Sequence, residues 1–148
     1  MAEYELAQLN VAQMKTPLDA PEMADFVNNL DRINTLAETA PGFVWRLTGE
    51  GDNATSIRPF GESTLVNMSV WRDVEALSDY VYKTAHVEIM KRRKEWFERM
   101  SEAYTVLWWV PQGHRPDEYE AMQRLQTLRA MGPTDKAFSF KQAFPKPA

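Results

Sequence analysis

A histidine and two tyrosines lie close together in the segment "YVYKTAH", residues 80–86. Histidine is the side chain whose ordinary pKa lies nearest neutrality, so His86 could transfer a proton or bind a metal. Tyr82 and Tyr80 precede it by four and six residues, so on a helix one of them could share a surface with the imidazole. The alternative is a polar histidine at a helix end or surface, hydrogen-bonded to the backbone. His114 lies in a predicted loop, which favours a turn or an interface.

Amide side chains and an indole form a second group of candidates. Residues 4–14 alternate as a strand does, with Ala7, Leu9 and Val11 on one face and Gln8 and Asn10 on the other. The segment "TLVNMSVW" alternates in the same way, and its second face carries Asn67, Ser69 and Trp71. These residues could orient a ligand oxygen and hold a flat ring.

The remaining elements follow from capping and turn signals. Asp19 and Pro21 predict the start of a helix that ends before Pro41, and "GFVWRLTG" predicts a second strand. Asp73 predicts a helix that continues or bends towards residue 100. A strand over 103–111 and a helix over 117–131 complete the order. We expect the tail, residues 133–148, to dock on the domain or on a second subunit.

The order strand–helix–strand–strand–helix–strand predicts one α+β, ferredoxin-like βαββαβ domain over residues 1–148, with an extra C-terminal helix. Two helices cover one face of such a sheet. We expect Ala7, Leu9 and Val11 to meet these helices and the amides to lie on the other face, in a groove or against a partner. An unpaired buried amide costs about 1–3 kcal/mol, so this composition favours a pocket. Amides paired across a dimer interface are the alternative.

Composition excludes several functions. The net charge of −4 and the pI near 5.2 argue against a nucleic-acid binder. Without cysteine there is no disulfide, thiolate metal site or cysteine nucleophile. Neither histidine belongs to a multi-ligand metal pattern, and no glycine-rich phosphate loop is present, so we expect no metal and no tightly bound organic cofactor. No apolar run has membrane-spanning length, and we expect a cytoplasmic protein with no membrane partner.

Basic and aromatic residues add further candidates. The run Lys91 to Lys94 could attract an anion, but it is followed by acids and is more typical of a solvated helix face. Trp108 and Trp109 must point to opposite sides of their strand. Trp45 and Arg46 must likewise point to opposite sides of their strand, and Arg46 could bind an acidic ligand group. The candidate substrate-binding residues are Gln8, Asn67, Ser69, Trp71, Tyr80, Trp45 and Arg46.

Segments over the whole chain resemble an uncharacterised bacterial family, the domain of unknown function numbered 3291. They include residues 6–47, "VNMSVW", "YKTAH", "RRKEWF" and "LWWVPQGHRPDEYEAMQRLQTL". The family resembles the dimeric α/β-barrel superfamily, in which two ferredoxin-like units close their open sheet faces into one barrel. Its members include antibiotic-biosynthesis monooxygenases, haem-degrading monooxygenases, chlorite dismutases and stress-response domains. The resemblance implies this fold and a homodimer, but no single reaction.

The haem-degrading branch uses an asparagine on the first strand, a helical tryptophan and a later histidine. Asn10, Tyr80 and His86 match these positions, with tyrosine in place of tryptophan. The resemblance therefore implies haem binding through His86 as one alternative.

Our hypothesis from sequence is a monooxygenase-like oxidoreductase that binds a small planar hydrophobic or aromatic molecule without a tightly bound organic cofactor. Asn10 and Asn67 would orient a carbonyl or enolate oxygen, and His86 or Tyr82 would handle a proton. The alternatives are a haem-binding or haem-degrading enzyme and a non-catalytic binding or sensing dimer.

Overall fold

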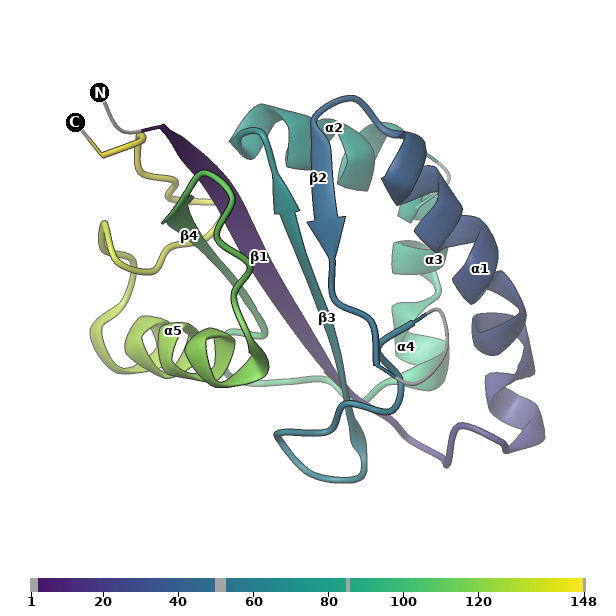
Figure 1. Ribbon diagram of the computed structural model, residues 1–148. Coiled ribbons are helices and arrows are strands. Elements are labelled where there is room, and N and C mark those ends of the chain that lie inside the picture. Colours follow the sequence, from purple (N-terminus) through teal and green to yellow (C-terminus); the bar gives the residue numbers. More distant parts are fainter. Residues whose placement is uncertain (1–2, 50–52, 85, 148) are drawn as a thin grey trace.

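Four antiparallel strands form the sheet of the computed structural model, which describes residues 3–49, 53–84 and 86–147 (Figure 1). They are β1 (Tyr4–Gln13), β2 (Phe43–Arg46), β3 (Thr64–Trp71) and β4 (Thr105–Pro111). The spatial order β2-β3-β1-β4 puts β1 and β3 side by side at the centre of the sheet. This confirms the predicted α+β, ferredoxin-like arrangement.

The helices are η1 (Pro21–Met23), α1 (Ala24–Thr39), α2 (Val74–Lys83), α3 (His86–Lys91), α4 (Arg93–Trp96) and α5 (Glu118–Met131). Asp73 and Asp117 cap α2 and α5, as predicted, because each accepts a hydrogen bond from a backbone N–H three residues later. The prediction for Asp19 is wrong. The chain enters a short 3-10 helix after Ala20 without a side-chain cap, and α1 starts only at Ala24.

The helices cover both faces of the sheet. Figure 1 shows α1 to α4 on one side and α5 on the other. The α5 side is packed with apolar residues: Ala7, Leu9, Val11, Val66, Met68 and Val70 from the central strands meet Ala121, Leu125 and Leu128 of α5. On the other side Leu6 and Trp71 pack against Ala37 of α1 and Leu77 of α2.

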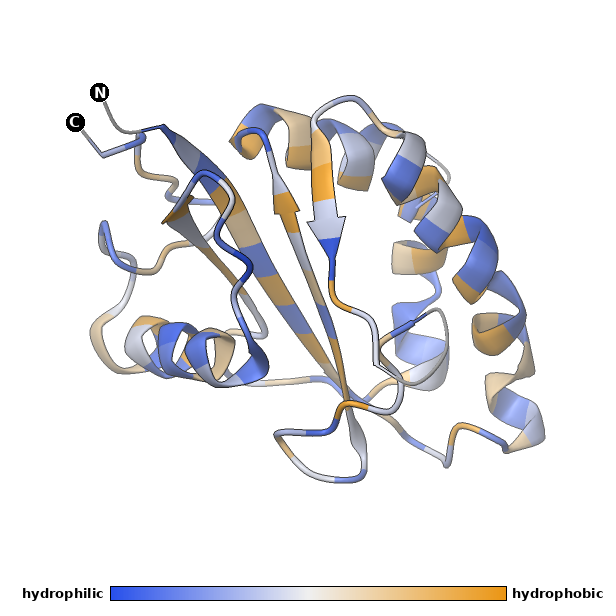
Figure 2. Ribbon diagram, viewed as in Figure 1, coloured by the Kyte–Doolittle hydropathy of each residue, from blue (hydrophilic) through white to orange (hydrophobic). Residues whose placement is uncertain are grey.

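The predicted assignment of the two faces is therefore wrong. Gln8, Asn10, Asn67, Ser69 and Trp71 lie beneath α1 to α4, and the all-apolar face lies beneath α5. Strand alternation separates two faces, as the banding of β1 in Figure 2 shows, but it does not say which layer covers which. Burial stabilises the all-apolar face more than the mixed face, and the C-terminal helix of the same chain buries that apolar face. In the described part of the chain the sheet thus carries helices on both faces, and the expected open face is not observed.

The tail runs along β4. Phe138 forms a backbone bridge with Leu107 and is fully buried in the cluster that contains Leu6 and Trp71. Trp108 and Trp109 point to opposite faces, as predicted, because Trp108 packs on the α5 side and Trp109 beside Phe138. The tail thus completes the core on the α2 side of the sheet.

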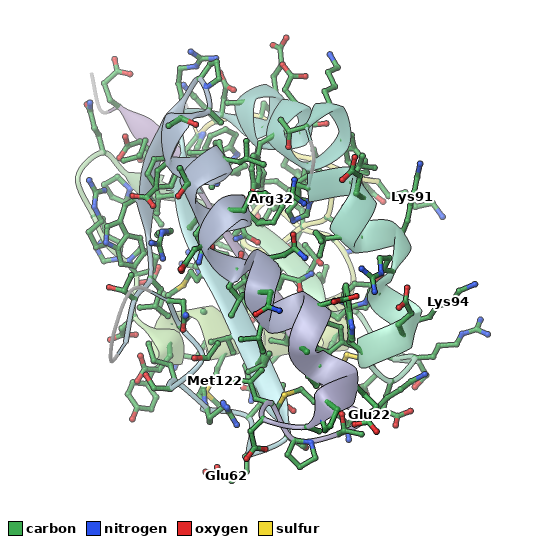
Figure 3. All side chains as sticks on the ribbon, turned by 90° about the vertical axis from the view of Figure 1, so that its right-hand side faces the viewer. Glu22, Arg32, Glu62, Lys91, Lys94 and Met122 are labelled. Atoms are coloured by element: carbon green, nitrogen blue, oxygen red, sulfur yellow. The ribbon has the colours of Figure 1, made fainter. Side chains whose placement is uncertain are left out.

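The basic run, Lys91 to Lys94, contains two arginines that contact other parts of the protein and two lysines that face solvent. Arg92 lies over the Trp96 ring and pairs with Asp25 of α1, while the Arg93 guanidinium lies 4.3 Å from the centre of the Tyr104 ring. Figure 3 shows Lys91 and Lys94 pointing away from the helical layer. The two arginines therefore fasten α3 and α4 to their neighbours, and the lysines form a solvated face.

Candidate functional site

Two adjacent rows of polar side chains cross the sheet beneath α1 to α4. Strand register puts Arg46, Ser69 and Gln8 in one row and Asn67, Asn10 and Thr105 in the next. We call these six residues the polar belt. The rows on either side of it are apolar: Phe43, Trp71, Leu6 and Trp109 at one end, and Leu65 and Ala12 at the other. The belt is thus an isolated polar patch on a helix-covered face.

Hydrogen bonds join the belt across the two central strands. The Gln8 side-chain amide donates to Asn67 Oδ1 at 2.7 Å and to Ser69 Oγ at 2.8 Å. Trp71 Nε1 also donates to Ser69 Oγ, at 2.7 Å. Gln8, Ser69 and Trp71 are buried, so the two bonds to Ser69 form away from water and fix these side chains in one arrangement.

Asn67 is the accessible member of this network. It is the exposed residue of β3, and its neighbours Val66 and Met68 are buried. Gln8 donates to the side-chain oxygen of Asn67, so the amide nitrogen of Asn67 is left to donate to a group outside the protein. Along the part of the chain that the structure describes, this nitrogen has no hydrogen-bond partner. An exposed, oriented donor on a helix-covered face is the main feature of the site.

An aromatic stack extends from the belt into the helical layer. The Trp71 and Tyr80 rings are stacked, with centroids 5.1 Å apart, and the His86 ring centre lies 5.0 Å from that of Tyr80. The Tyr80 hydroxyl donates to the Ile33 carbonyl oxygen at 3.0 Å, which joins α2 to α1. Burial raises the pKa of Tyr80 despite the nearby Arg46 charge, so the phenol keeps its proton at neutral pH.

His86 is held in its neutral form. Burial lowers its pKa from 6.5, and a backbone hydrogen bond at Val81 opposes that shift. Its Nδ1 atom is buried and has no hydrogen-bond partner among the described residues. A neutral imidazole with an unpartnered nitrogen can accept a proton. Haem ligation through Nδ1, the alternative, would require this buried atom to become accessible.

Arg46 marks the β2 end of the belt. Its Nη2 lies 3.2 Å from Glu38 Oε1 of α1, and its side chain is only 15% exposed. A cavity of about 290 Å³ lies here, lined by Asp31, Asn34, Thr35 and Glu38 of α1 together with Arg46. The cavity therefore lies between α1 and the sheet edge, at the side of the polar belt.

The inner side of α1 is incompletely packed. The helix has an apolar side, yet Phe26, Leu30, Ile33 and Leu36 are only partly buried, and Ala37 is the one residue of α1 that is buried. Core side chains in a finished layer would be excluded from water almost completely. Apolar surface of α1 thus stays partly accessible on the same side of the sheet as the exposed Asn67 amide, as in a site for a hydrophobic molecule.

Two predicted site residues lie elsewhere. Trp45 packs on the α5 side of the sheet, so it lies on the opposite face from the polar belt. Tyr82 is 51% exposed and lies against Phe140 of the tail. Asn10 belongs to the belt, but its amide nitrogen donates to Thr105 Oγ1 at 2.8 Å. The structure thus brings together Gln8, Asn10, Asn67, Ser69, Trp71, Tyr80, His86 and Arg46 on one side of the sheet.

Residues 5–148 match a protein family described as "Domain of unknown function (DUF3291)". The chain belongs to this family. No curated protein matches it. In the residues that the structure describes, this DUF3291 chain has no group of three or more acidic or histidine side chains able to hold a metal ion. No described helix combines the length and apolar character needed to cross a membrane.

Solved structures include distant likenesses to this DUF3291 chain. A protein of unknown function from Nitrosomonas europaea, NE2512, is 14% identical, with a TM-score of 0.49 over 79% of this chain and 97% of that one. SnoaB, a cofactor-independent oxygenase from Streptomyces nogalater, is 15% identical, with a TM-score of 0.43 over 77% and 96%. PA3566 from Pseudomonas aeruginosa is 12% identical, with a TM-score of 0.44 over 77% and 99%. At these values the likenesses carry no functional information.

Sequence reasoning missed two members of the site in this DUF3291 chain. Thr105 starts β4, and only the strand register shows that it lies beside Asn10. Glu38 lies on a helix that carries other acids, so no local signal distinguishes it as the partner of Arg46. Both pairings are contacts between distant segments, which a single sequence does not reveal.

Proposed function

We propose that the protein is a monooxygenase-like oxidoreductase that binds a small planar hydrophobic molecule between the polar belt and α1, without a tightly bound organic cofactor. The observation that carries this proposal is the exposed Asn67 amide, oriented by Gln8 within an otherwise buried network. The partly buried apolar side of α1 would lie against the flat ring. The belt would provide the polar contacts that fix its orientation.

The chemistry requires a substrate with an acidic methylene group beside a carbonyl or phenol. His86 would take one proton on its Nδ1, which must become accessible as the ligand enters, and the Asn67 amide nitrogen would donate to the oxygen that carries the resulting negative charge. The carbanion would reduce molecular oxygen directly. One oxygen atom would become a carbonyl in place of the methylene, and the other would leave as water with both methylene hydrogens.

The test is oxygen consumption by the purified protein with a panel of phenols, quinols and related fused-ring compounds. Turnover of labelled oxygen gas should put one labelled atom into the product and the other into water. A compound that raises the melting temperature saturably but is not converted would instead favour the non-catalytic binding protein. A Soret shift on haemin addition that depends on His86 would favour the haem alternative. No oxygen consumption with any compound would contradict the proposal.

A further inference from the structure

A second cleft lies between the end of β4, one side of α5 and the start of the tail. Its volume is about 810 Å³, and none of its lining residues belongs to the polar belt. Three of its charged or polar residues, His114, Glu120 and Arg124, come from the loop after β4 and from α5. The cleft is thus separate from the proposed oxygenase site.

A chain of hydrogen bonds runs from the core to this cleft. Trp108 is fully buried, and its indole nitrogen donates to Glu120 Oε2 at 2.9 Å. The other carboxylate oxygen, Glu120 Oε1, lies 2.7 Å from His114 Nε2. An indole nitrogen can only donate, so the core fixes one carboxylate oxygen and leaves the other to orient the imidazole.

This contact determines how His114 faces the cleft. In a neutral imidazole, a carboxylate beside Nε2 favours the tautomer that carries its proton there, which leaves Nδ1 as an acceptor. The His114 side chain is 44% exposed, so a ligand can approach it. The imidazole is therefore an oriented hydrogen-bond acceptor at the surface of the cleft.

Positive charge lies on the same walls. Arg124 is four residues after Glu120 and so lies on the same side of α5, and it donates to the Lys136 carbonyl oxygen at 2.8 Å. The two acids of the cleft are engaged, since Asp117 caps α5 and Glu120 is held by Trp108 and His114. Arg124 and Lys136 thus supply cationic groups that can face a ligand.

We propose that this cleft binds a small organic anion that also carries a hydroxyl group. Its carboxylate or phosphate lies against Arg124 and Lys136, and its hydroxyl donates to His114 Nδ1. Glu120 acts as a positioning residue, because it holds the imidazole and does not touch the ligand.

Nuclear magnetic resonance of the full-length protein tests the proposal, with 3-hydroxybutyrate, glycerol 3-phosphate and butyrate as probes. Saturable shifts are expected for the Trp108 indole N–H and for the backbone amides of residues 114–124. Butyrate should bind more weakly than 3-hydroxybutyrate because it lacks the hydroxyl. The relative affinity of glycerol 3-phosphate distinguishes a phosphate site from a carboxylate site.

Matched variants distinguish a specific binding site from non-specific electrostatic attraction. Arg124→Gln should weaken binding about tenfold, while Arg32→Gln on α1 should leave it unchanged. His114→Gln should weaken binding of 3-hydroxybutyrate but not of butyrate. Melting curves and circular dichroism show whether each variant folds. The absence of saturable shifts with all three probes, or equal effects of Arg124→Gln and Arg32→Gln, would overturn the proposal.

Discussion

At the scale of single residues, the candidate site depends on two side chains with unused hydrogen-bonding capacity. Asn67 presents an exposed amide nitrogen while Gln8 holds its oxygen, and His86 has a buried, unpartnered Nδ1. An unpaired polar atom in a folded interior costs stability, so the buried Nδ1 of His86 suggests a ligand that completes it, whereas the exposed Asn67 nitrogen is free to bind water or a ligand. The residue types were readable from the sequence. The hydrogen-bond directions were not, because they depend on the pairing of β1 with β3.

His86 predicts a loss of stability in mild acid. Burial lowers its pKa from 6.5, so just below that value the unfolded chain binds a proton that the folded protein does not. The free energy of unfolding should therefore fall as the pH drops below about 6.5 and should level off below the lowered pKa. Urea unfolding of the wild type and His86→Gln across this range checks the effect.

The second histidine provides the control for this measurement. His114→Gln should keep the His86-dependent loss, and His86→Gln should reduce it. If the two variants show the same pH dependence as the wild type, His86 is not the group responsible.

At the scale of elements, α1 and α2 differ in how tightly they pack. Leu77 of α2 is buried in the core, whereas Leu30 of α1 is only partly buried. Leu77→Ala should lower the free energy of unfolding by about 2–5 kcal/mol, and Leu30→Ala by about 1 kcal/mol or less. Chemical denaturation of both variants measures this difference. Equal losses would show that α1 closes tightly on the sheet, and would remove the room for a ligand.

The sequence predicted the elements better than their layers. Alternation in β1 and β3, and the caps Asp73 and Asp117, located strands and helix starts correctly. The predicted assignment of faces is wrong because the sequence does not show that α5 covers the all-apolar face. The exposed sides of α5 are strongly polar, and only Ala121, Leu125 and Leu128 are buried. Its sequence pattern therefore does not indicate a core helix.

At the scale of the whole molecule, the tail is part of the folded unit. Phe138 is fully buried and bridges to β4, far in sequence from Leu6 and Trp71, with which it packs. Phe138→Ala should lower the free energy of unfolding by about 3–5 kcal/mol. Tyr119→Ala, at a residue that is 68% exposed, should change it by less than about 0.5 kcal/mol. A Phe138→Ala variant as stable as Tyr119→Ala would show that the tail is not docked in solution.

The homodimer remains a prediction from the family resemblance. Because α5 covers the all-apolar face, two sheets cannot close a barrel through that face while α5 stays in place. Light scattering gives the mass in solution. A dimer that survives substitutions on the exposed side of α5 must use another surface.

The central claim is that the ligand lies against Asn67 on the helix-covered face of the sheet. Asn67→Ala is compared with Asn28→Ala, an exposed asparagine of α1, by oxygen consumption with whichever panel compound the wild type converts. Loss of an oriented donor to a developing oxyanion should lower kcat about 100-fold or more in Asn67→Ala and leave Asn28→Ala unchanged. An Asn67→Ala protein with full activity would contradict the account.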